Sequence, residues 1–317
     1  NYGHYHLGRV CYEQNDLTAA EEHFGAIVRQ PYLNYGNCFA YGACGLALTH
    51  QSQGRPDEAQ AVTEAASMSM LETGNTTLMP AIQAIQAELA LRQGRIAQAS
   101  QWAAQLDPVP PLTPMVELFS PHLTLAKIWM AQGTTESRQR AADLLDSAQE
   151  FVETTHNTRF LIEVLALQAL LKEMQGNREA ALELLTQAIG LAEPGRFIRL
   201  FVDLGPPVAR LLRELRRQDV APEYVPQILS AFEMTHDGPR AVEPPIRPSS
   251  PLVDPLTPRE LEVLGLLGRH LTNTEIAEEL VVSPSTVKTH TLNIYRKLEV
   301  HGRKQAVVKA KELGLLA

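Results

Sequence analysis

The stretch TEIAEELVVSPSTVKTHTLNIYRKL, from Thr274 to Leu298, contains the pattern of two short helices separated by a break. In its first part Ile276 and Leu280 lie four residues apart, on one helical face, and Thr274 is placed to cap that helix. Pro284 then begins the second helix. Proline has no N–H, and at the first position of a helix an N–H would have no partner within the helix. The sequence therefore predicts two helices joined by a tight turn.

The second helix of this pair is apolar on one face and basic elsewhere. Val287, Ile294 and Leu298 recur at helical spacing and predict the buried face. Between Pro284 and Lys311 there are seven Lys or Arg residues and one acidic residue, in a chain whose formal net charge is −8. This pattern is typical of a helix-turn-helix, whose second helix enters the DNA major groove. A solvated helix face is the alternative explanation of the basic residues.

Two further helices complete a small module over residues 256–317. The segment LTPRELEVLGLLGRHL, beginning at Leu256, has leucines at helical spacing. The segment GRKQAVVKAKELGLL, beginning at Gly302, repeats its apolar residues in the same way. We therefore expect four short helices around a small apolar core.

Several motifs make this module similar to the LuxR-type helix-turn-helix domain. They are LTPRELEVL, NTEIAEEL, STVKTH and NIY, followed by KL and QAV. The run VKTHTLNIYRKLEV with its RKQAVVKAKELGLL tail resembles in particular the MalT-like branch of large regulators. In that branch the DNA-binding domain ends a long chain, behind a helical-repeat sensor domain that receives an inducer or a partner protein. The resemblance implies a transcriptional regulator that binds double-stranded DNA.

Positions of the second helix that point away from its apolar face are candidates for DNA contact. Lys288 can donate to guanine, and Thr289 and Leu292 can contact thymine methyl groups. We expect phosphate contacts, which position the helix without reading sequence, from Thr286, Asn293, Arg296 and Lys297. His290 lies beside the apolar face, so it is either half-buried or directed at phosphate. The resemblance favours Thr286 and Lys288, and Leu292 stands where the family has a basic residue, which leaves the operator sequence open.

One such module makes few base contacts, so we expect a homodimer on a two-fold symmetric DNA site. In LuxR-type domains the last helix usually supplies the contact between the two copies. The resemblance therefore implies a dimer interface at Val307, Ala310 and Lys311. Packing of Val307 and Ala310 inside the module is the alternative.

Residues 1–190 contain five copies of a helix, a polar turn and a second helix. The copies include YHLGRVCYEQNDLTAAEEHF, GACGLALTHQSQGRPDEAQAV and EVLALQALLKEMQGNREAALELL, and they recur about every 40 residues. In each copy a Gly or Asn in the turn is followed by an alanine, which is small enough to let the two helices approach closely. One copy, from Gly133 to Ala141, carries three extra residues that we assign to the turn. The period predicts helical hairpins stacked into a superhelix.

The first copy resembles a tetratricopeptide repeat, since Leu7 and Gly8 are followed by Ala20 and Phe24. The period here exceeds the roughly 34 residues of that repeat, so longer helices or loops must absorb the difference. The predicted fold is all-α: a tetratricopeptide-like helical-hairpin superhelix followed by a four-helix LuxR-type helix-turn-helix domain.

A superhelix has a concave groove, and the first repeats of this one are rich in tyrosine. Because ligand sites are lined by aromatic side chains with a few polar groups, we expect an effector groove at Tyr5, Tyr12, Tyr35 and Tyr41. The alternative is that these tyrosines pack between hairpins with their hydroxyls at the surface. The sequence does not define whether the effector is a small molecule or a protein.

Two segments connect the repeats to the DNA-binding module. Residues 191–236 change pattern and predict terminal helices that cap the superhelix. Residues 237–255 hold six prolines and few apolar residues, which is typical of a linker between domains. The basic residues gather in residues 256–317 while the rest of the chain is acidic, so we expect a local DNA contact by the last module.

The sequence gives no sign of an enzyme, a metal site or a membrane protein. Its three cysteines lack metal or redox spacing, and its ten histidines are scattered. No GxSxG, HExxH or GxxxxGK[ST] motif occurs, so we expect neither catalysis nor a cofactor in this chain. In the MalT-like branch an ATP-binding domain precedes the sensor domain, and here that domain either was removed with the N-terminus or is lacking from this protein. The absence of an initial Met fits an excised piece of a longer protein. We expect a cytoplasmic protein without a membrane span.

The function expected from the sequence is that of a DNA-binding transcriptional regulator with an effector-receiving repeat domain. A protein-interaction scaffold, whose helix-turn-helix docks another protein, is the competing interpretation. Salt separates the two interpretations, because only contacts with several phosphates weaken steeply as salt rises.

Overall fold

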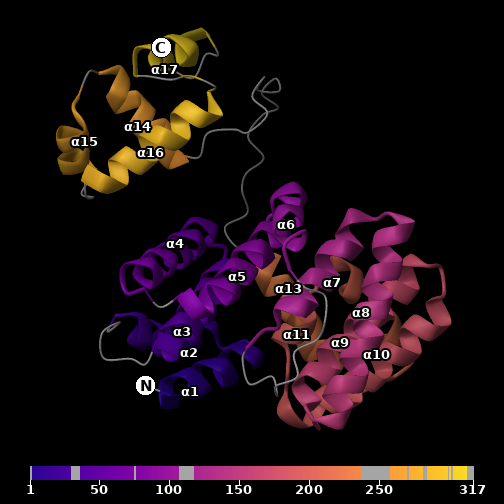
Figure 1. Cartoon of the computed structure of the whole chain (residues 1–317). Helices are drawn as coiled ribbons and strands as arrows, with labels where there is room; N and C mark the ends of the chain where they lie inside the picture. Colours follow the sequence, from indigo (N-terminus) through magenta and orange to yellow (C-terminus); the bar gives the residue numbers. More distant parts are fainter. Residues whose placement is uncertain are drawn as a thin grey trace. The chain divides into compact units, whose positions relative to one another are not determined.

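The structure is a computed structural model of the chain, and it describes residues 2–29, 36–74, 76–106, 118–236, 258–269, 271–280, 284–298, 300 and 303–312. The chain forms two units, residues 1–240 and 241–317 (Figure 1). The boundary falls in the predicted linker 237–255, which lies outside the described residues. Every regular element in the described ranges is helical, which confirms the all-α prediction. None of the described helices combines the length and the apolar composition needed to cross a membrane.

The first unit begins with five helical hairpins, one for each predicted repeat. Helices adjacent in the chain pair with each other, and successive hairpins stack along a curve (Figure 1). The pairs are α1 (Tyr2–Glu13) with α2 (Leu17–Val28), α3 (Gly36–Ser52) with α4 (Pro56–Glu72), α5 (Met79–Arg92) with α6 (Ile96–Ala103), α7 (Pro121–Gln132) with α8 (Thr135–Thr154), and α9 (Thr158–Met174) with α10 (Arg178–Ala192). A short 3-10 helix, η2 (Thr76–Leu78), precedes α5. The prediction of tetratricopeptide-like hairpins is confirmed.

The turn inside each hairpin contains one residue in the left-handed conformation. Such a residue ends one helix and redirects the chain, and glycine and asparagine adopt this conformation at the lowest cost. These residues are Asn15, Gly54, Gly94, Gly133 and Gly176. The alanine that follows each turn is fully buried, as expected for a point of close helix approach; the five are Ala20, Ala59, Ala99, Ala141 and Ala181.

The fourth hairpin differs from the prediction for its turn. α8 begins at Thr135, directly after Gly133 and the N-cap residue Thr134. The Thr134 hydroxyl accepts a hydrogen bond from the Ser137 N–H at 3.0 Å. The three extra residues before Ala141 therefore belong to the helix and not to the turn. They add nearly one helical turn, so Ala141 still faces inward.

Close approach of the first two hairpins depends on Phe24. Its ring is fully buried between Gly8 of α1 and Gly45 of α3. A Cβ atom at Gly8 would lie 2.8 Å from the ring, and one at Gly45 would lie 2.5 Å from it. Both positions therefore require glycine in this packing.

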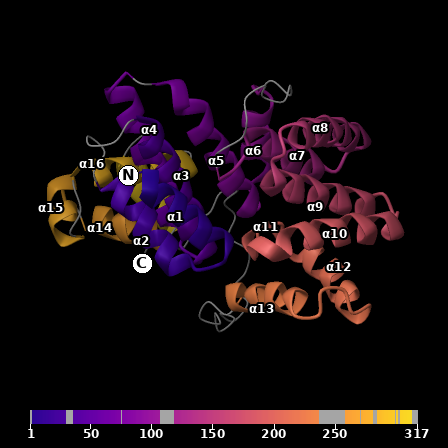
Figure 2. The same cartoon turned by 90° about the horizontal axis from the view of Figure 1, so that it is seen from below.

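Three further helices complete the first unit and return the chain to its start. They are α11 (Arg199–Val202), α12 (Pro206–Arg217) and α13 (Tyr224–His236), preceded by the 3-10 helix η3 (Glu193–Gly195). The Ile198 N–H donates to the Glu13 carbonyl oxygen at 2.7 Å, and Arg199 donates to the Asn15 side chain at 3.2 Å. The last segment of the superhelix thus contacts the first, and Figure 2 shows α11 next to α1.

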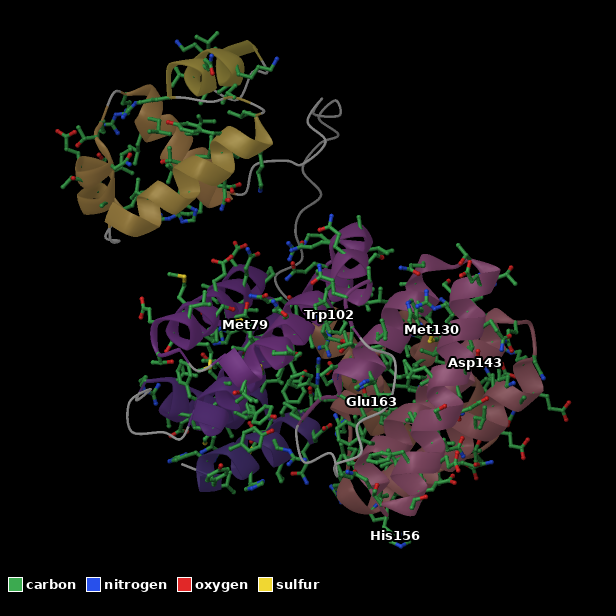
Figure 3. The ribbon with its side chains drawn as sticks, in the orientation of Figure 1. Met79, Trp102, Met130, Asp143, His156 and Glu163 are labelled. Atoms are coloured by element: carbon green, nitrogen blue, oxygen red, sulfur yellow. The ribbon has the colours of Figure 1, made fainter. Side chains whose placement is uncertain are left out.

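Two hydrophobic cores stabilise the first unit. One is built mainly from α1 to α5 with Leu118 and Phe119, and the other from α5 to α13. α5 contributes to both cores, with Leu89 in the first and Ala90 in the second. Trp102 packs against both cores, and Figure 3 shows it between the two groups of helices.

The second unit consists of four helices around its own core. They are α14 (Pro258–Gly268), α15 (Asn273–Glu279), α16 (Pro284–Lys297) and α17 (Arg303–Glu312). Ile276, Val287 and Ile294 are fully buried, and Leu298 is 1% exposed. The prediction of four helices around an apolar core is confirmed, with the second helix of the motif beginning at Pro284.

Candidate functional site

The helix pair α15–α16 is capped by a different residue from the one expected. Thr272 precedes α15, and its hydroxyl accepts from the Glu275 N–H at 3.3 Å. The Glu275 carboxylate in turn accepts from the Thr272 N–H at 2.6 Å and from its hydroxyl at 2.8 Å. This reciprocal arrangement is a capping box. Thr274, which we expected to cap, lies inside the helix and is exposed.

α16 has one buried face and one face turned from the core. Val287, Thr291, Ile294 and Leu298 are buried, and Thr291 Oγ1 donates to the Val287 carbonyl oxygen at 2.8 Å. Since a helix turns by about 100° per residue, positions 289, 292 and 296 fall opposite this face and position 288 falls at its edge.

The candidate DNA-contacting side chains of α16 fall into two groups. His290 and Asn293 are partly buried. The other predicted contacts remain predictions, because these side chains lie outside the described part of the structure: Thr286, Lys288, Thr289, Leu292 and Arg296.

Two of the basic residues hold the helices of this unit together. Lys297 Nζ lies 2.8 Å from the Glu260 carboxylate of α14, and the two side chains are 10% and 4% exposed. Arg303 donates to the carbonyl oxygens of Leu267 and Leu271 at 3.0 and 2.6 Å. The predicted phosphate contact of Lys297 does not fit its burial, and we assign it instead to the link between α14 and α16.

α17 separates the residues predicted for a dimer interface. Ala310 is fully buried in the core of the unit itself, so it packs inside and is withdrawn from the predicted interface. Val307 is partly buried and Lys311 is exposed, and their dimer contact remains a prediction. Val308 of the same helix, which is not among the predicted contacts, is 57% exposed.

The predicted effector tyrosines do not form an open groove. Tyr5 is buried, with its ring centroid 6.3 Å from that of Phe24 and 6.1 Å from that of Tyr41. Its hydroxyl accepts from the Leu118 N–H at 3.1 Å. Tyr41 is partly buried, and Tyr35 lies outside the described residues. Tyr5 and Tyr41 therefore pack between hairpins, as in the alternative, but the Tyr5 hydroxyl is buried and does not lie at the surface.

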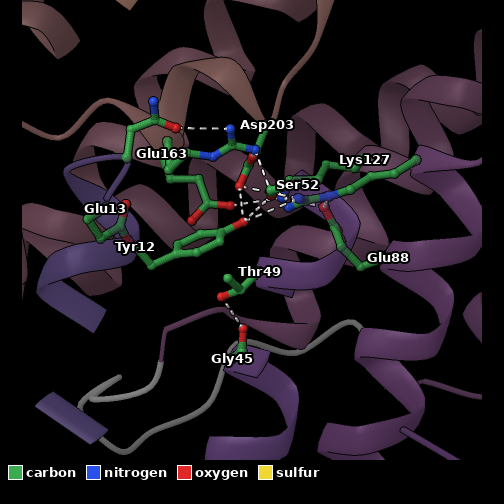
Figure 4. Close-up of polar contacts among 12 residues, drawn as sticks. Tyr12, Glu13, Gly45, Thr49, Ser52, Glu88, Lys127, Glu163 and Asp203 are labelled. Carbon is green, nitrogen blue, oxygen red and sulfur yellow. Dashed lines mark hydrogen bonds and ion pairs between the residues drawn. The ribbon is translucent and has the colours of Figure 1, made fainter. Parts of the chain in front are cut away.

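Tyr12 is buried as well, but its hydroxyl is part of a polar cluster. It donates to Asp203 Oδ2 at 2.7 Å and lies 3.2 Å from Ser52 Oγ (Figure 4). These contacts connect α1 with α3 and with the end of α11. The expectation of a ligand-lining role for Tyr12 is thus replaced by a contact that closes the superhelix.

Eight charged side chains form a continuous series through the interior of the first unit. Figure 4 labels five of them: Glu13, Glu88, Lys127, Glu163 and Asp203. Positive and negative groups alternate along this charged series, and each member contacts the next in the order Glu13, Arg159, Glu163, Lys127, Glu88, Arg92, Asp203 and Arg199. Seven of the members lie in α1, α5, α7, α9 and α11, and Asp203 directly follows α11. Alternating signs matter because a buried charge without a partner is strongly destabilising.

Glu88 is a carboxylate of the charged series that its partners hold in the ionised form. Burial raises the pKa of Glu88, but the charges of Lys127 and Arg92 outweigh it. Hydrogen bonds from Arg92 and Thr124 act in the same direction, and the pKa of Glu88 is about 2. Glu88 therefore stays ionised across the physiological pH range.

The carboxyl groups nearest the two ends of the charged series, Glu13 and Asp203, differ. Burial raises the pKa of Glu13, and the charge of Arg159 does not fully offset this effect. For Asp203 burial again raises the pKa, but Arg199 and Arg92 lower it further, so the net direction is downward. Among these carboxyl groups Glu13 is the one that takes up a proton most readily.

A cavity of about 460 Å³ borders the charged series. Helices α3, α5, α7, α9 and α11 line it together with the start of α12. Its charged lining residues are Glu88, Arg92, Lys127, Arg199 and Asp203. Its apolar lining residues are Leu91, Met130, Ala131, Leu167, Leu170, Met174, Val202, Leu204 and Pro207. The volume is that of a small-molecule site.

The sequence held a signal for the charged series that our reasoning missed. Glu88, Lys127 and Glu163 are single charged residues within apolar helical segments, for example FLIEVLALQALL around Glu163. A charge in such a segment is either directed outward or paired in the interior. The identity of the partners depends on which hairpins meet, and a single helix does not encode it.

Comparisons with known proteins agree with both units. A family model described as the MalT-like TPR region matches residues 2–218, and one described as bacterial regulatory proteins, luxR family, matches residues 254–310. The HTH-type transcriptional regulator MalT of Vibrio cholerae serotype O1 is 31% identical over 193 residues, which are 56% of this chain and 21% of the relative. That of Vibrio campbellii is 27% identical over 206 residues, which are 60% of this chain and 22% of the relative.

These matches confirm the resemblance found in the sequence. The chain spans about a fifth of the length of the two curated relatives. The first family model covers more than half of the chain, and the second falls on the unit that contains α15 and α16. The chain therefore belongs to the MalT-like TPR family and carries a LuxR-family domain after its helical repeats.

Proposed function

We propose that this chain is the sensor and DNA-reading part of a transcriptional regulator. The observation that carries the proposal is the helix pair α15–α16, which is capped, rests on its own core and has the second helix turned outward along one face. A helix presented in this way fits the major groove of DNA. The LuxR-family match over residues 254–310 supports the same function.

In this proposal residues of α16 both read bases and bind phosphate. Lys288 donates to guanine, while Thr289 and Leu292 contact thymine methyl groups. Thr286, Asn293 and Arg296 contact phosphates, and Lys297 is left out because it pairs with Glu260. His290 lies at the border of the buried face of α16, so it contacts only a phosphate on that side of the helix.

The regulator acts as a dimer on DNA, with α17 at the contact between two copies. Val308 and Lys311 are exposed on this helix, and Val307 is partly buried. An exposed valine on a helix that is otherwise polar on its outer face supports an apolar contact there. Two copies then place two recognition helices on a two-fold symmetric site.

The proposal is tested by DNA binding of the whole chain and of two variants. A duplex enriched from a random-sequence pool supplies the specific site, and fluorescence anisotropy measures affinity for it and for unrelated DNA. We expect Lys288→Ala to lower the specific affinity by about 1–3 kcal/mol and to reduce the ratio of specific to nonspecific affinity.

Arg269→Ala is the matched control, because it removes one positive charge from an exposed position of the same unit, outside α16 and α17. It should leave that ratio unchanged while helical content stays equal in both variants. Unaltered specific binding by Lys288→Ala would remove Lys288 from the interface.

Salt dependence tests the competing function of a protein-interaction scaffold. If several phosphates are bound, affinity for DNA falls steeply and linearly with salt on a logarithmic scale. The scaffold function would be favoured if the chain enriched no sequence from the pool and if its weak affinity for DNA did not fall with salt concentration.

We further propose that the repeat domain receives the effector. The cavity beside the charged series supports this role, since it lies where both ends of the superhelix meet. An effector there contacts elements from α3 to α12 and so favours one curvature of the superhelix over another. DNA affinity with and without effector is the measurement that reports this coupling.

A further inference from the structure

We infer that the cavity beside the charged series binds an uncharged small molecule with an apolar body and a hydrogen-bond acceptor, such as a ketone or ester carbonyl. The inference rests on the proposed role of the repeat domain as the receiver of an effector. It adds the place of binding and the chemical class of the ligand.

The apolar walls of the cavity favour a ligand with an apolar body. Leu167 and Leu170 of α9 face this space together with Met130 of α7 and Leu91 of α5. Met174, at the end of α9, is 39% exposed and lines the cavity where solvent reaches it. Contact with these side chains removes apolar ligand surface from water, which is the main source of affinity in sites of this size.

The charged side of the cavity disfavours a charged ligand. Its carboxylates and cations already neutralise each other along the charged series. An added anion would lie near Glu88 and Asp203, and an added cation near Arg92 and Lys127. Each would be taken out of water without an unpaired partner of opposite sign, which is costly.

Three side chains of the lining keep hydrogen-bond donors beyond their described contacts. Lys127 has three N–H donors and contacts two carboxylates, Glu88 and Glu163, among the described residues. Arg92 uses Nε and Nη1 in its described contacts, which leaves Nη2 available. Gln51 accepts from Gln93 through Oε1 at 2.7 Å, so its NH2 group is directed elsewhere.

The acceptors of the same lining are engaged by partners. Glu88 accepts from Arg92 and Lys127 at Oε1 and from Thr124 at Oε2. Asp203 accepts from Arg199 at Oδ1 and from Tyr12 at Oδ2. Available donors beside occupied acceptors select a ligand that accepts hydrogen bonds, and a carbonyl oxygen does so without a charge.

The test uses two probes that share a naphthalene body. Prodan is an uncharged naphthyl ketone, and the corresponding dimethylaminonaphthoate carries a carboxylate in place of the ketone. Each is titrated into the whole chain while its emission is recorded. We expect saturable, blue-shifted binding of prodan, with the naphthoate at least about tenfold weaker. Binding of the naphthoate as tight as that of prodan would overturn the assignment of an uncharged ligand.

A matched pair of variants locates the probe. Ala131→Phe fills the cavity from an exposed position of α7, and Ala65→Phe adds the same side chain at an exposed position of α4 away from it. Prodan should bind about tenfold or more weakly to Ala131→Phe and unchanged to Ala65→Phe. Equal binding by both variants would overturn the cavity as the site.

A further variant tests the hydrogen-bond donors of the cavity without changing its charge or filling it. Gln51→Leu removes the amide donor and should weaken prodan by several-fold, on the order of one lost hydrogen bond. Tighter binding of prodan to this variant would contradict the acceptor requirement. Circular dichroism of each variant establishes that helical content is retained.

DNA binding of the same samples separates this inference from the proposed function. One outcome is that prodan binds saturably, that Ala131→Phe abolishes this binding, and that the chain selects no DNA sequence. That outcome would support the cavity site and overturn the proposed regulator function. Sequence-selective DNA binding without saturable prodan binding would overturn the cavity site and leave the regulator standing.

Discussion

Glu88 and Glu13 belong to the same charged series but respond to acid in opposite ways. The pKa of Glu88 falls on folding from 4.5 to about 2, so its charge stabilises the folded state above pH 4.5 and this contribution is lost as pH falls toward 2. For Glu13 burial raises the pKa, so its charge opposes folding at neutral pH and this cost disappears in acid.

We predict that Glu88→Gln lowers the free energy of unfolding of the first unit at pH 7 by about 3 kcal/mol. The deficit should shrink as the pH is lowered below 4.5. Urea unfolding followed by tryptophan fluorescence measures it, because Trp102 and Trp129, the two tryptophans of the chain, both lie in the first unit. Glu13→Gln is the control and should cost far less at pH 7. Equal losses in both variants would contradict the assigned difference.

The close packing at Gly45 gives a second prediction at the scale of single residues. A methyl group at this position would lie 2.5 Å from the Phe24 ring, so Gly45→Ala should destabilise the first unit by about 1–3 kcal/mol. Gly190 of α10 has open space around it, and Gly190→Ala should stabilise by roughly 0.5–1 kcal/mol through helix propensity. The same urea measurement compares the two. A neutral Gly45→Ala would mean that Phe24 moves freely.

At the scale of single elements, the capping box of α15 controls how firmly the recognition pair is held. Thr272→Ala should weaken α15 by about 1 kcal/mol, while Thr274→Ala should change it by less than about 0.5 kcal/mol. Amide hydrogen exchange of α15 in the whole chain measures both. Faster exchange in Thr274→Ala than in Thr272→Ala would restore Thr274 as the cap.

The sequence contained enough information for most of the elements. The recurring turn residue and alanine located five hairpins, because both follow from local backbone and packing requirements. The spacing Thr272-x-x-Glu275 is that of a capping box, so the correct cap of α15 was also present in the sequence. The residues after Gly133 are polar and suit a turn as well as a first helical turn, so the sequence alone does not place this insertion.

The candidate sites were less accessible to prediction. The outward face of α16 follows from helical periodicity, and so does the burial of Val287 and Ile294. The ion pair of Lys297 with Glu260 joins α14 to α16, and the interior charged series joins five helices that are far apart in the sequence. Such pairs depend on tertiary contacts, which no single helix specifies.

At the scale of the whole first unit, contact between the first and last segments changes the expected unfolding. An open solenoid frays from its ends, since each repeat contacts only its neighbours. Here α1 is bonded to the segment around Ile198 and Arg199. We predict that α1 and α9 lose amide protection at the same urea concentration in native-state hydrogen exchange.

Asp203→Asn supplies the comparison for this prediction. It weakens the contact of Tyr12, Arg92 and Arg199 with one another, so α1 should then exchange at a lower urea concentration than α9. Early exchange of α1 in the unaltered chain would mean that the closing contact contributes little to stability.

The lengthened start of α8 bears on how domains of this kind can diversify. Three added residues rotate a helix by about 300°, close to a full revolution, so the side chains beyond them return to nearly the same direction. An addition of one or two residues would instead turn Ala141 and its neighbours out of the interior. Viable changes in repeat length should therefore come in steps of three or four residues. The outer edge of the superhelix can then change in length during evolution while the side chains of its inner wall keep their directions.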